Sequence, residues 1–223
     1  MNNRDNMQDH KFQRKAIQVK EAQARVMQYA KVLGIEEVPL SQSCGRYLAE
    51  SVNAPHPFPA FNRSGMDGYA IIAADTQECN AENPVWLEVI DNIPCGAVPS
   101  ADLTPGTAAR IMTGAQVPEG ADAVVMIEIT ESRERDGKTF VLLRKPQLAG
   151  SNITPRGFEL KEGQLVLTAG RLIAAGDIAV LAAFGIHMVK VHRRPKVAIF
   201  ATGSELLAVD EPLQPGKVRN SNS

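Results

Sequence analysis

The residues best suited to chemistry lie in a glycine-containing loop around Asp67. Gly65 and Gly68 flank Met66 and Asp67, so the backbone can turn sharply on both sides of one carboxylate, and a bulky anion can approach the main chain closely. Ser64 adds a hydroxyl next to the first glycine. The alternative interpretation is an ordinary turn before a strand, in which Asp67 bonds to its own backbone, and the loop alone does not decide between the two.

A second loop, residues 110–122, offers complementary groups. Thr113 and Gly114 follow a short apolar run that is typical of a strand. A hydroxyl and free backbone amides at the end of a strand can form a nest that binds an anion. The alternative is two hairpin turns in succession, because residues 118–120 (PEG) are a turn in their own right.

Two further loops combine glycine with charged or hydroxyl side chains. The first has Arg156 and Glu159 on either side of Gly157, and the second is residues 202–205, Thr-Gly-Ser-Glu. The alternative interpretation of the second is a helix N-cap. Carboxylates and anion-cradling amides suit the Mg²⁺-assisted handling of a phosphate or another oxyanion, provided that the loops converge in space.

The composition excludes several classes of protein. The chain has 223 residues, of which 24 are Lys or Arg and 25 are Asp or Glu. A net charge near zero argues against nucleic acid or a membrane surface as partner. The cysteines Cys44, Cys79 and Cys95 lie far apart, which fits reduced thiols better than a disulfide framework or a zinc site. The N-terminus lacks the apolar core of a signal peptide, and charged or polar residues interrupt the longest apolar run, so we expect a cytoplasmic chain without a membrane span.

The spacing of apolar residues predicts the elements that position these loops. A helix is expected over residues 18–33, ended by Gly34, and a second helical segment around residues 45–52. An Asp-Gly pair at residues 136–137 predicts a hairpin. Short strands are expected at residues 69–73, 85–90, 108–112, 123–129 and 139–144.

After residue 150 the pattern predicts a helix over residues 176–184 and strands at residues 189–191 and 196–200. The last run is almost continuously apolar, as in a buried parallel strand. It leads into residues 202–205 in the manner of the first βα crossover of a doubly wound sheet. Because a parallel sheet needs several such units, the sequence looks cut short.

Together these elements predict a multidomain α+β fold. A mixed, partly helical domain is expected to comprise residues 1–54 and 147–194, with a β-rich domain, residues 55–146, inserted into it. Residues 195–223 are expected to begin a truncated α/β domain.

Taken together, the loops resemble the molybdopterin molybdenumtransferase family, to which the C-terminal half of gephyrin also belongs. The two longest matching stretches are residues 59–70 (PAFNRSGMDGYA) and 110–128 (RIMTGAQVPEGADAVVMIE). Shorter ones follow in the same order at residues 150–153 (GSNI), 198–206 (AIFATGSEL) and 215–222 (PGKVRNSN). The similarity runs from about residue 18 to the end of the chain.

The resemblance implies an elongated dimeric subunit, with an active site between the molybdopterin-binding α/β domain of one subunit and the inserted β domain of the other. It implies insertion of molybdate into adenylylated molybdopterin with release of AMP, assisted by Mg²⁺, and molybdopterin adenylyltransferase as the substrate donor. By motif position the catalytic residues are Asp67, Thr113, Glu205 and Glu159, and the metal ligands are Asp67 and Glu205. The residues implied to contact substrate are Ser64, Met66, Gly68, Gly114, Arg156, Thr202, Gly203, Ser204 and Asn222.

The chain also departs from the family pattern. Phe158 stands where a Glu is usual, Glu159 where an Asp is usual and Thr154 where an Arg is frequent, so this loop has lost a cation and a carboxylate. Ser204 and Asn220 replace Asp residues of many members but can still form hydrogen bonds. Family members are also considerably longer, and we therefore expect an N-terminal portion that is inactive by itself.

Two other functions are compatible with these residues. One is a non-catalytic dimerisation or scaffold module, comparable to the receptor-anchoring role of gephyrin. The other is a metal-dependent phosphotransferase that uses the turn at residues 202–205.

Overall fold

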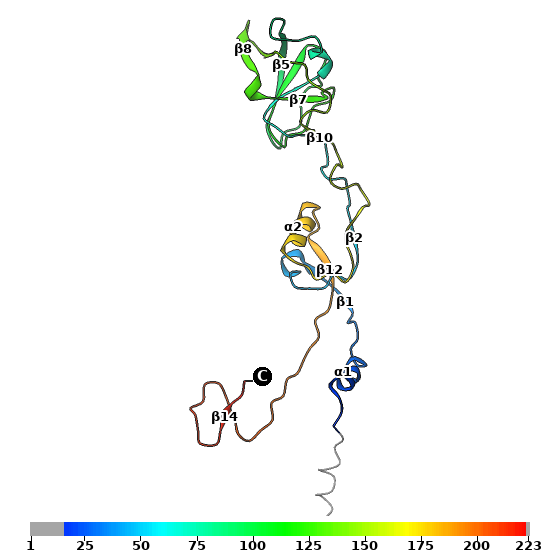
Figure 1. Ribbon diagram of the computed structural model, residues 1–223, viewed down its shortest axis with the longest axis vertical. Helices are drawn as coiled ribbons and strands as arrows, with labels where there is room; N and C mark the ends of the chain where they lie inside the picture. The colour runs from blue at the N-terminus through cyan, green and yellow to red at the C-terminus, as the bar shows by residue number, and fades with distance from the viewer. Residues whose placement is uncertain (1–15, 222–223) are drawn as a thin grey trace, which may run out of the picture.

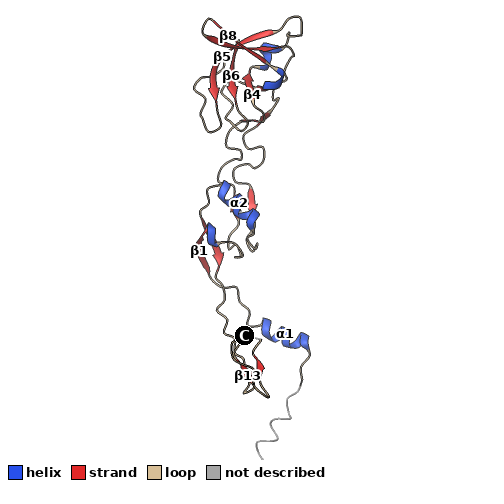
Figure 2. Ribbon diagram, turned by 90° about the vertical axis from the view of Figure 1, so that its left-hand side faces the viewer, coloured by secondary structure: helices blue, strands red, loops and turns tan. Residues whose placement is uncertain are grey.

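The computed structural model describes residues 16–221. They form an elongated molecule with a β-rich unit at one end, a smaller mixed unit in the middle, and helix α1 and the C-terminal strands at the other end (Figures 1 and 2). The chain runs up through the middle unit into the β-rich unit and returns along the same neck.

The β-rich unit is built on one six-stranded sheet with the order β7-β4-β6-β5-β9-β8, in which β5 and β6 run parallel and the other neighbours antiparallel. Its strands are β4 (Gly68–Ile71), β5 (Val85–Ile93), β6 (Thr107–Ile111), β7 (Ala123–Met126), β8 (Glu131–Arg135) and β9 (Lys138–Leu143). Short 3₁₀ helices, η3 (Ala73–Thr76) and η4 (Ile127–Ile129), follow β4 and β7. The strands predicted between residues 69 and 144 are confirmed apart from their ends, because residue 73 already belongs to η3 and residues 127–129 turn into η4.

Both faces of this sheet are covered. Side chains alternate along β4, so Tyr69 and Ile71 belong to one apolar cluster while Ala70 belongs to the other. The predicted hairpin joins β8 to β9, and Asp136 and Gly137 both have positive φ, as a type I′ turn requires. The result is a sheet packed on both faces, and the candidate loops lie at the ends of its strands.

The middle unit brings together segments that precede and segments that follow the six-stranded sheet in the chain. Strand β1 (Ile35–Pro39) pairs antiparallel with β12 (Met188–His192), and β2 (Val52–Asn53) pairs with β11 (Leu165–Leu167). Helix α2 (Ala175–Ala183) and the 3₁₀ helix η2 (Leu40–Gln42) complete the unit. One apolar cluster holds it together, namely Val38, Leu48, Leu167, Ile173, Leu181, Val189 and Val191. The limits of the domains at residues 54, 146 and 194 stay predictions.

Local chemistry explains the ends of α2. The buried carboxylate of Asp177 accepts hydrogen bonds from the backbone N–H of Ala174 and from Nε of Arg171, and the Arg171 bond is the larger cause of a lowered pKa of Asp177. The backbone of Gly185, with φ of 70°, ends the helix, as the sequence predicted. Between the middle unit and the sheet, β3 (Arg63–Ser64) pairs with β10 (Ile153–Thr154) in the neck.

Both N-terminal helix predictions need correction. Helix α1 spans Val19–Met27 and stops well before Gly34, and none of its residues is buried, so no tertiary packing supports further turns. The segment 45–52 is not helical. The backbone of Gly45 has φ of 72°, and the N–H groups of Leu48 and Ala49 donate to carbonyls of residues 171 and 190, which holds this segment extended.

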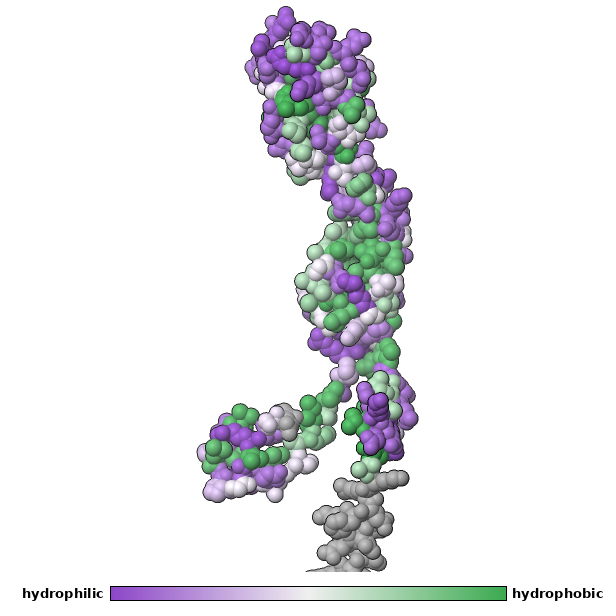
Figure 3. All heavy atoms as spheres, viewed as in Figure 1, coloured by the Kyte–Doolittle hydropathy of each residue, from purple (hydrophilic) through white to green (hydrophobic). Residues whose placement is uncertain are grey.

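The predicted strand at residues 196–200 is also wrong. These residues have no strand pairing, and Ile199 and Phe200 are 66% and 86% exposed. Figure 3 shows hydrophobic residues along the segment that leads from the middle unit to the C-terminal strands. The short strands β13 (Leu206–Leu207) and β14 (Val218–Arg219) pair in parallel instead, and no helix follows residue 200 within the described chain. An extended run needs a neighbouring strand to satisfy its backbone groups, and the described residues offer none here. The βα unit is therefore not formed.

Across residues 16–221, no helix is long and apolar enough to cross a bilayer.

The close contact between β4 and β7 gives a test of the sheet. A Cβ atom added at Gly68 would lie 1.7 Å from the carbonyl oxygen of Val125. We expect Gly68→Ala to lower the free energy of unfolding by about 3 kcal/mol, because backbone must move to relieve the overlap. Chemical denaturation of the purified chain measures this change.

The matched control is Gly176→Ala in the first turn of α2, where a Cβ meets nothing within 4 Å. Its expected effect is below about 1 kcal/mol and stabilising, because alanine restricts the unfolded chain. Equal denaturation midpoints for the two variants would contradict the close packing of β4 on β7.

Candidate anion and metal site

Asp67 and Thr113 meet because of the register between two strands. In the antiparallel pair β4–β6, Gly68 at the start of β4 lies opposite Ile111 at the end of β6. The residues just before β4 and just after β6 therefore lie at the same end of the strand pair. The backbone N–H and the hydroxyl of Thr113 both donate to Oδ1 of Asp67, each at 2.7 Å. The structure thus brings together the two loops that the sequence marked as separate candidates.

Backbone contacts hold these two loops against each other. The N–H of Gly114, whose φ is 82°, donates to the carbonyl of Ser64 at 2.8 Å, and the N–H of Ser64 donates to the carbonyl of Ala115 at 2.9 Å. The buried hydroxyl of Ser64 donates to the carbonyl of Met66 at 2.6 Å. The hydroxyl of Ser64 therefore shapes the loop, while Met66 is 41% exposed at its surface.

The same hydrogen bonds set the charge of Asp67. The backbone N–H of Thr113 and then its hydroxyl lower the pKa of the Asp67 carboxyl, and the nearby positive charge of Arg110 lowers it further. Asp67 is exposed and, of its two carboxylate oxygens, only Oδ1 accepts hydrogen bonds from residues 16–221. An ionised carboxylate with one oxygen tied and the other oxygen free is a hard oxygen ligand that suits Mg²⁺.

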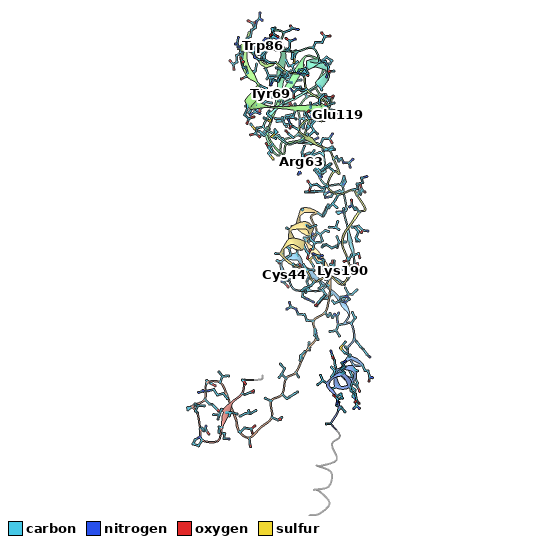
Figure 4. All side chains as sticks on the ribbon, in the orientation of Figure 1. Cys44, Arg63, Tyr69, Trp86, Glu119 and Lys190 are labelled. Carbon is cyan, nitrogen blue, oxygen red and sulfur yellow. The ribbon has the colours of Figure 1, made fainter. Side chains whose placement is uncertain are left out.

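The third candidate loop contacts the start of the first. Glu159 forms an ion pair with Arg63 at 2.7 Å, and Oδ1 of Asn62 accepts a hydrogen bond from the backbone N–H of Arg156 at 2.9 Å. Figure 4 shows Arg63 at the neck end of the β-rich unit. Residues 62–67 therefore contact both the second and the third loop. The carboxylate of Glu159 is held by a cation rather than pointing at Thr113 or Asp67.

The fourth loop lies at the opposite end of the molecule. Thr202 and Glu205 border a hollow of about 410 Å³ beside β13 and β14, far from the six-stranded sheet in both views. Nζ of Lys217 donates to the carbonyl of Ser204 at 2.5 Å, and no helix follows that residue within the described chain, so the N-cap interpretation is wrong. One chain therefore does not bring Asp67 and Glu205 to a common metal. Asn222 lies outside the described residues.

No group of three or more His, Cys, Asp or Glu side chains suited to a metal occurs in the part of the chain that the structure describes.

One residue of this site, Arg110, was not predicted from the sequence. Nη1 of Arg110 donates to the carbonyls of Gly68 and Ile111 at 2.7 and 2.8 Å. In the sequence, Arg110 was noted only as the first residue of the matching stretch 110–128, and no role was predicted for it. Its role depends on the cross-strand pairing with Tyr69, which is not visible in the sequence.

Comparison with solved structures defines the class of fold. Two structures of the molybdopterin biosynthesis MoeA protein from Pyrococcus horikoshii align with TM-scores of 0.81 and 0.79, at 37% and 36% identity. They cover 94% and 93% of this chain, whereas this chain covers 55% and 52% of theirs. The fold is thus that of the first half of MoeA proteins.

The sequence comparison identifies the family. Residues 17–185 match the family described as the MoeA N-terminal region (domain I and II), and the chain belongs to that family. Relatives named molybdopterin molybdenumtransferase are 50% identical in Bacillus subtilis and 47% identical in Staphylococcus epidermidis, each over 94% of this chain. The chain spans about half the length of these relatives, 49% in both cases.

The hydrogen bonds between Thr113 and Asp67 predict a measurable titration. Thr113→Val removes the hydroxyl but keeps the backbone donor, so we expect the pKa of Asp67 to rise part of the way toward its ordinary value of about 3.9. Carboxyl chemical shifts followed by NMR from pH 2 to 6 measure this change.

The sign for stability follows from the lowered pKa. Asp67 stabilises the fold fully above its unfolded-state pKa, and this contribution disappears as the pH falls through the lower folded-state value. Thr113→Val should therefore reduce stability near neutral pH more than under strongly acidic conditions. An unchanged pKa of Asp67 in this variant would show that the hydroxyl does not bond to it.

Proposed function

We propose that this chain is the N-terminal part of a molybdopterin molybdenumtransferase, which inserts molybdate into adenylylated molybdopterin and releases AMP. Family membership and the names of the bacterial relatives support this proposal. Because the chain spans 49% of those relatives, the activity is assigned to the longer protein, and the chain by itself is proposed to be inactive.

The observation that carries the proposal is the exposed carboxylate of Asp67. One oxygen is oriented by two hydrogen bonds from Thr113, which leaves the other free for a metal or for a group of the substrate. Mg²⁺ typically binds one or two carboxylates together with substrate phosphates, and Asp67 fits that pattern. When bound, the ion neutralises negative charge on phosphate and molybdate oxygens.

The geometry favours different roles for Thr113 and Asp67. Both donors of Thr113 are used by Asp67, so Thr113 orients the carboxylate, and its hydroxyl reaches an oxyanion only by turning away from Asp67. A carboxylate fixed before substrate arrives costs little reorganisation during the reaction. Asp67 and Thr113, with the loop residues beside them, are called the Asp67 corner. Gly114 and Gly68 allow the close backbone contacts around this corner.

The remaining substrate contacts are proposed to come from a second copy of the longer chain. Thr202, Gly203, Ser204 and Glu205 belong to the C-terminal segment, which lies at the end of the molecule opposite the β-rich unit that contains Asp67. Asn222, outside the described residues, is assigned to the same copy from the sequence motif alone. In a homodimer this segment of one subunit meets the Asp67 corner of the other. Molybdopterin adenylyltransferase is the proposed donor of the substrate.

An apolar hollow supports the presence of a second subunit. Most of the lining of a hollow of about 750 Å³ is apolar or aromatic, and Tyr29 and Val32 in it are 84% and 83% exposed. Its apolar or aromatic lining residues include Tyr29, Val32, Leu33, Tyr47 and Pro195, and the polar ones are Lys31, His192 and Arg193. Apolar surface of this kind is typical of an interface. The homodimer accounts for it without a separate scaffold function.

A chimeric enzyme tests the proposal. Residues 1–221 of this chain are joined to the C-terminal half of the Bacillus subtilis relative, and molybdate-dependent release of AMP from adenylylated molybdopterin is measured. We expect activity from the chimera and none from the 223-residue chain alone. Asp67→Asn should lower the rate by about 100-fold or more, comparable to the loss of one preorganised electrostatic group.

The matched control is Asp136→Asn, an exposed Asp in the β8–β9 turn with φ of 54°, a conformation that Asn also adopts. This variant should keep the full rate. If the Asp67→Asn chimera is folded and dimeric but as active as the unsubstituted chimera, the proposed role of the carboxylate is ruled out.

A further inference from the structure

Arg110 is placed where the two loops of the site begin and end. It lies on β6 opposite Tyr69 of β4, one residue from the end of each strand. Its Nη1 donates to the carbonyl of Gly68 at 2.7 Å and to the carbonyl of Ile111 at 2.8 Å. One nitrogen therefore joins the strand that leaves the first loop to the strand that enters the second.

The two acceptors adjoin the functional residues. Gly68 directly follows Asp67, and Ile111 precedes Thr113 by two positions. A shift of either carbonyl would move the attached loop and change the distance between the carboxylate and the donors of Thr113. Hydrogen bonds from a charged donor are stronger than those between neutral groups, which suits a side chain that fixes geometry.

Aromatic packing and charge complete the arrangement. The guanidinium carbon of Arg110 lies 5.4 Å from the centre of the Tyr69 ring, and the arginine is half-buried there. The same positive charge favours the ionised form of Asp67. Arg110 thus acts on both the position and the charge of the corner without any hydrogen bond to Asp67 itself.

We propose that Arg110 is a positioning residue of this corner, which keeps Asp67 and Thr113 within hydrogen-bonding distance by fixing the ends of β4 and β6. The proposal rests on the proposed function only because it treats the Asp67–Thr113 contact as a working part of the protein. A merely structural arginine would support the whole sheet, whereas a positioning arginine supports the corner more than the rest.

Amide hydrogen exchange on the purified chain distinguishes these roles. In Arg110→Gln, we expect the Thr113 amide to exchange about tenfold faster than in the unsubstituted chain, which corresponds to roughly one hydrogen bond. The amides of Leu87 and Val141, in the β5–β9 pair of the same sheet, should change much less.

Arg133→Gln is the matched control. Arg133 lies 5.4 Å from the centre of the Trp86 ring but is on β8 at the far edge of the sheet. Figure 4 places Trp86 nearer the tip of the unit than Tyr69. This variant also loses an arginine stacked on an aromatic ring, and it should leave exchange at Thr113 unchanged.

Arg110→Lys separates charge from geometry, because lysine keeps the positive charge without the planar guanidinium. We expect intermediate protection of Thr113. If Arg110→Gln does not fold, the lysine variant decides alone. Selective loss of protection at Thr113 supports the proposal, and unchanged protection, or an equal loss across the sheet, overturns it.

The chimeric enzyme then separates this proposal from the proposed function. Arg110→Gln should lower AMP release while Arg133→Gln does not. An inactive unsubstituted chimera counts against the proposed function, whereas the exchange measurements still decide the role of Arg110. An active chimera whose rate is unaffected by Arg110→Gln would overturn the positioning role in catalysis.

Discussion

The contact between Asp67 and Thr113 is the constraint on which the rest of the site depends. Two donors of one residue hold one oxygen of an exposed carboxylate, and this arrangement exists only because Gly68 and Ile111 are paired in the sheet. Most of the β-rich unit can be understood as support for that pairing. Apolar clusters on both faces fix the strands, and glycine at position 68 lets β4 approach β7 closely.

The elongated shape separates the chemical groups of the chain. The contact between Asp67 and Thr113 forms within the β-rich unit, while residues 202–205 lie at the other end of the molecule beside exposed apolar side chains. In the proposed homodimer, a site that uses both regions combines two copies of the longer chain. This separation, together with a length half that of the relatives, explains why a chain with a well-formed corner is proposed to lack activity alone.

The sequence predicted what depends on local patterns and missed what depends on distant partners. The β8–β9 hairpin was predictable because Asp136 and Gly137 favour positive φ by themselves. Residues 45–52 were wrongly predicted as helical because the N–H groups of Leu48 and Ala49 bond to segments more than a hundred residues away in the sequence. Residues 196–200 look like a buried strand, but a strand forms only beside another. The loops at Asp67 and Thr113 were each visible as candidates, whereas their contact and the role of Arg110 needed the register of β4 and β6.

Scalar coupling across the hydrogen bond, detected by NMR between the Thr113 amide nitrogen and the Asp67 carboxyl carbon, reports directly on the contact between these two residues. We expect a cross peak between these two nuclei near neutral pH, comparable to those of the β4–β6 backbone hydrogen bonds in the same spectrum. Clear couplings for the strand pair without one from Thr113 to Asp67 would contradict this contact.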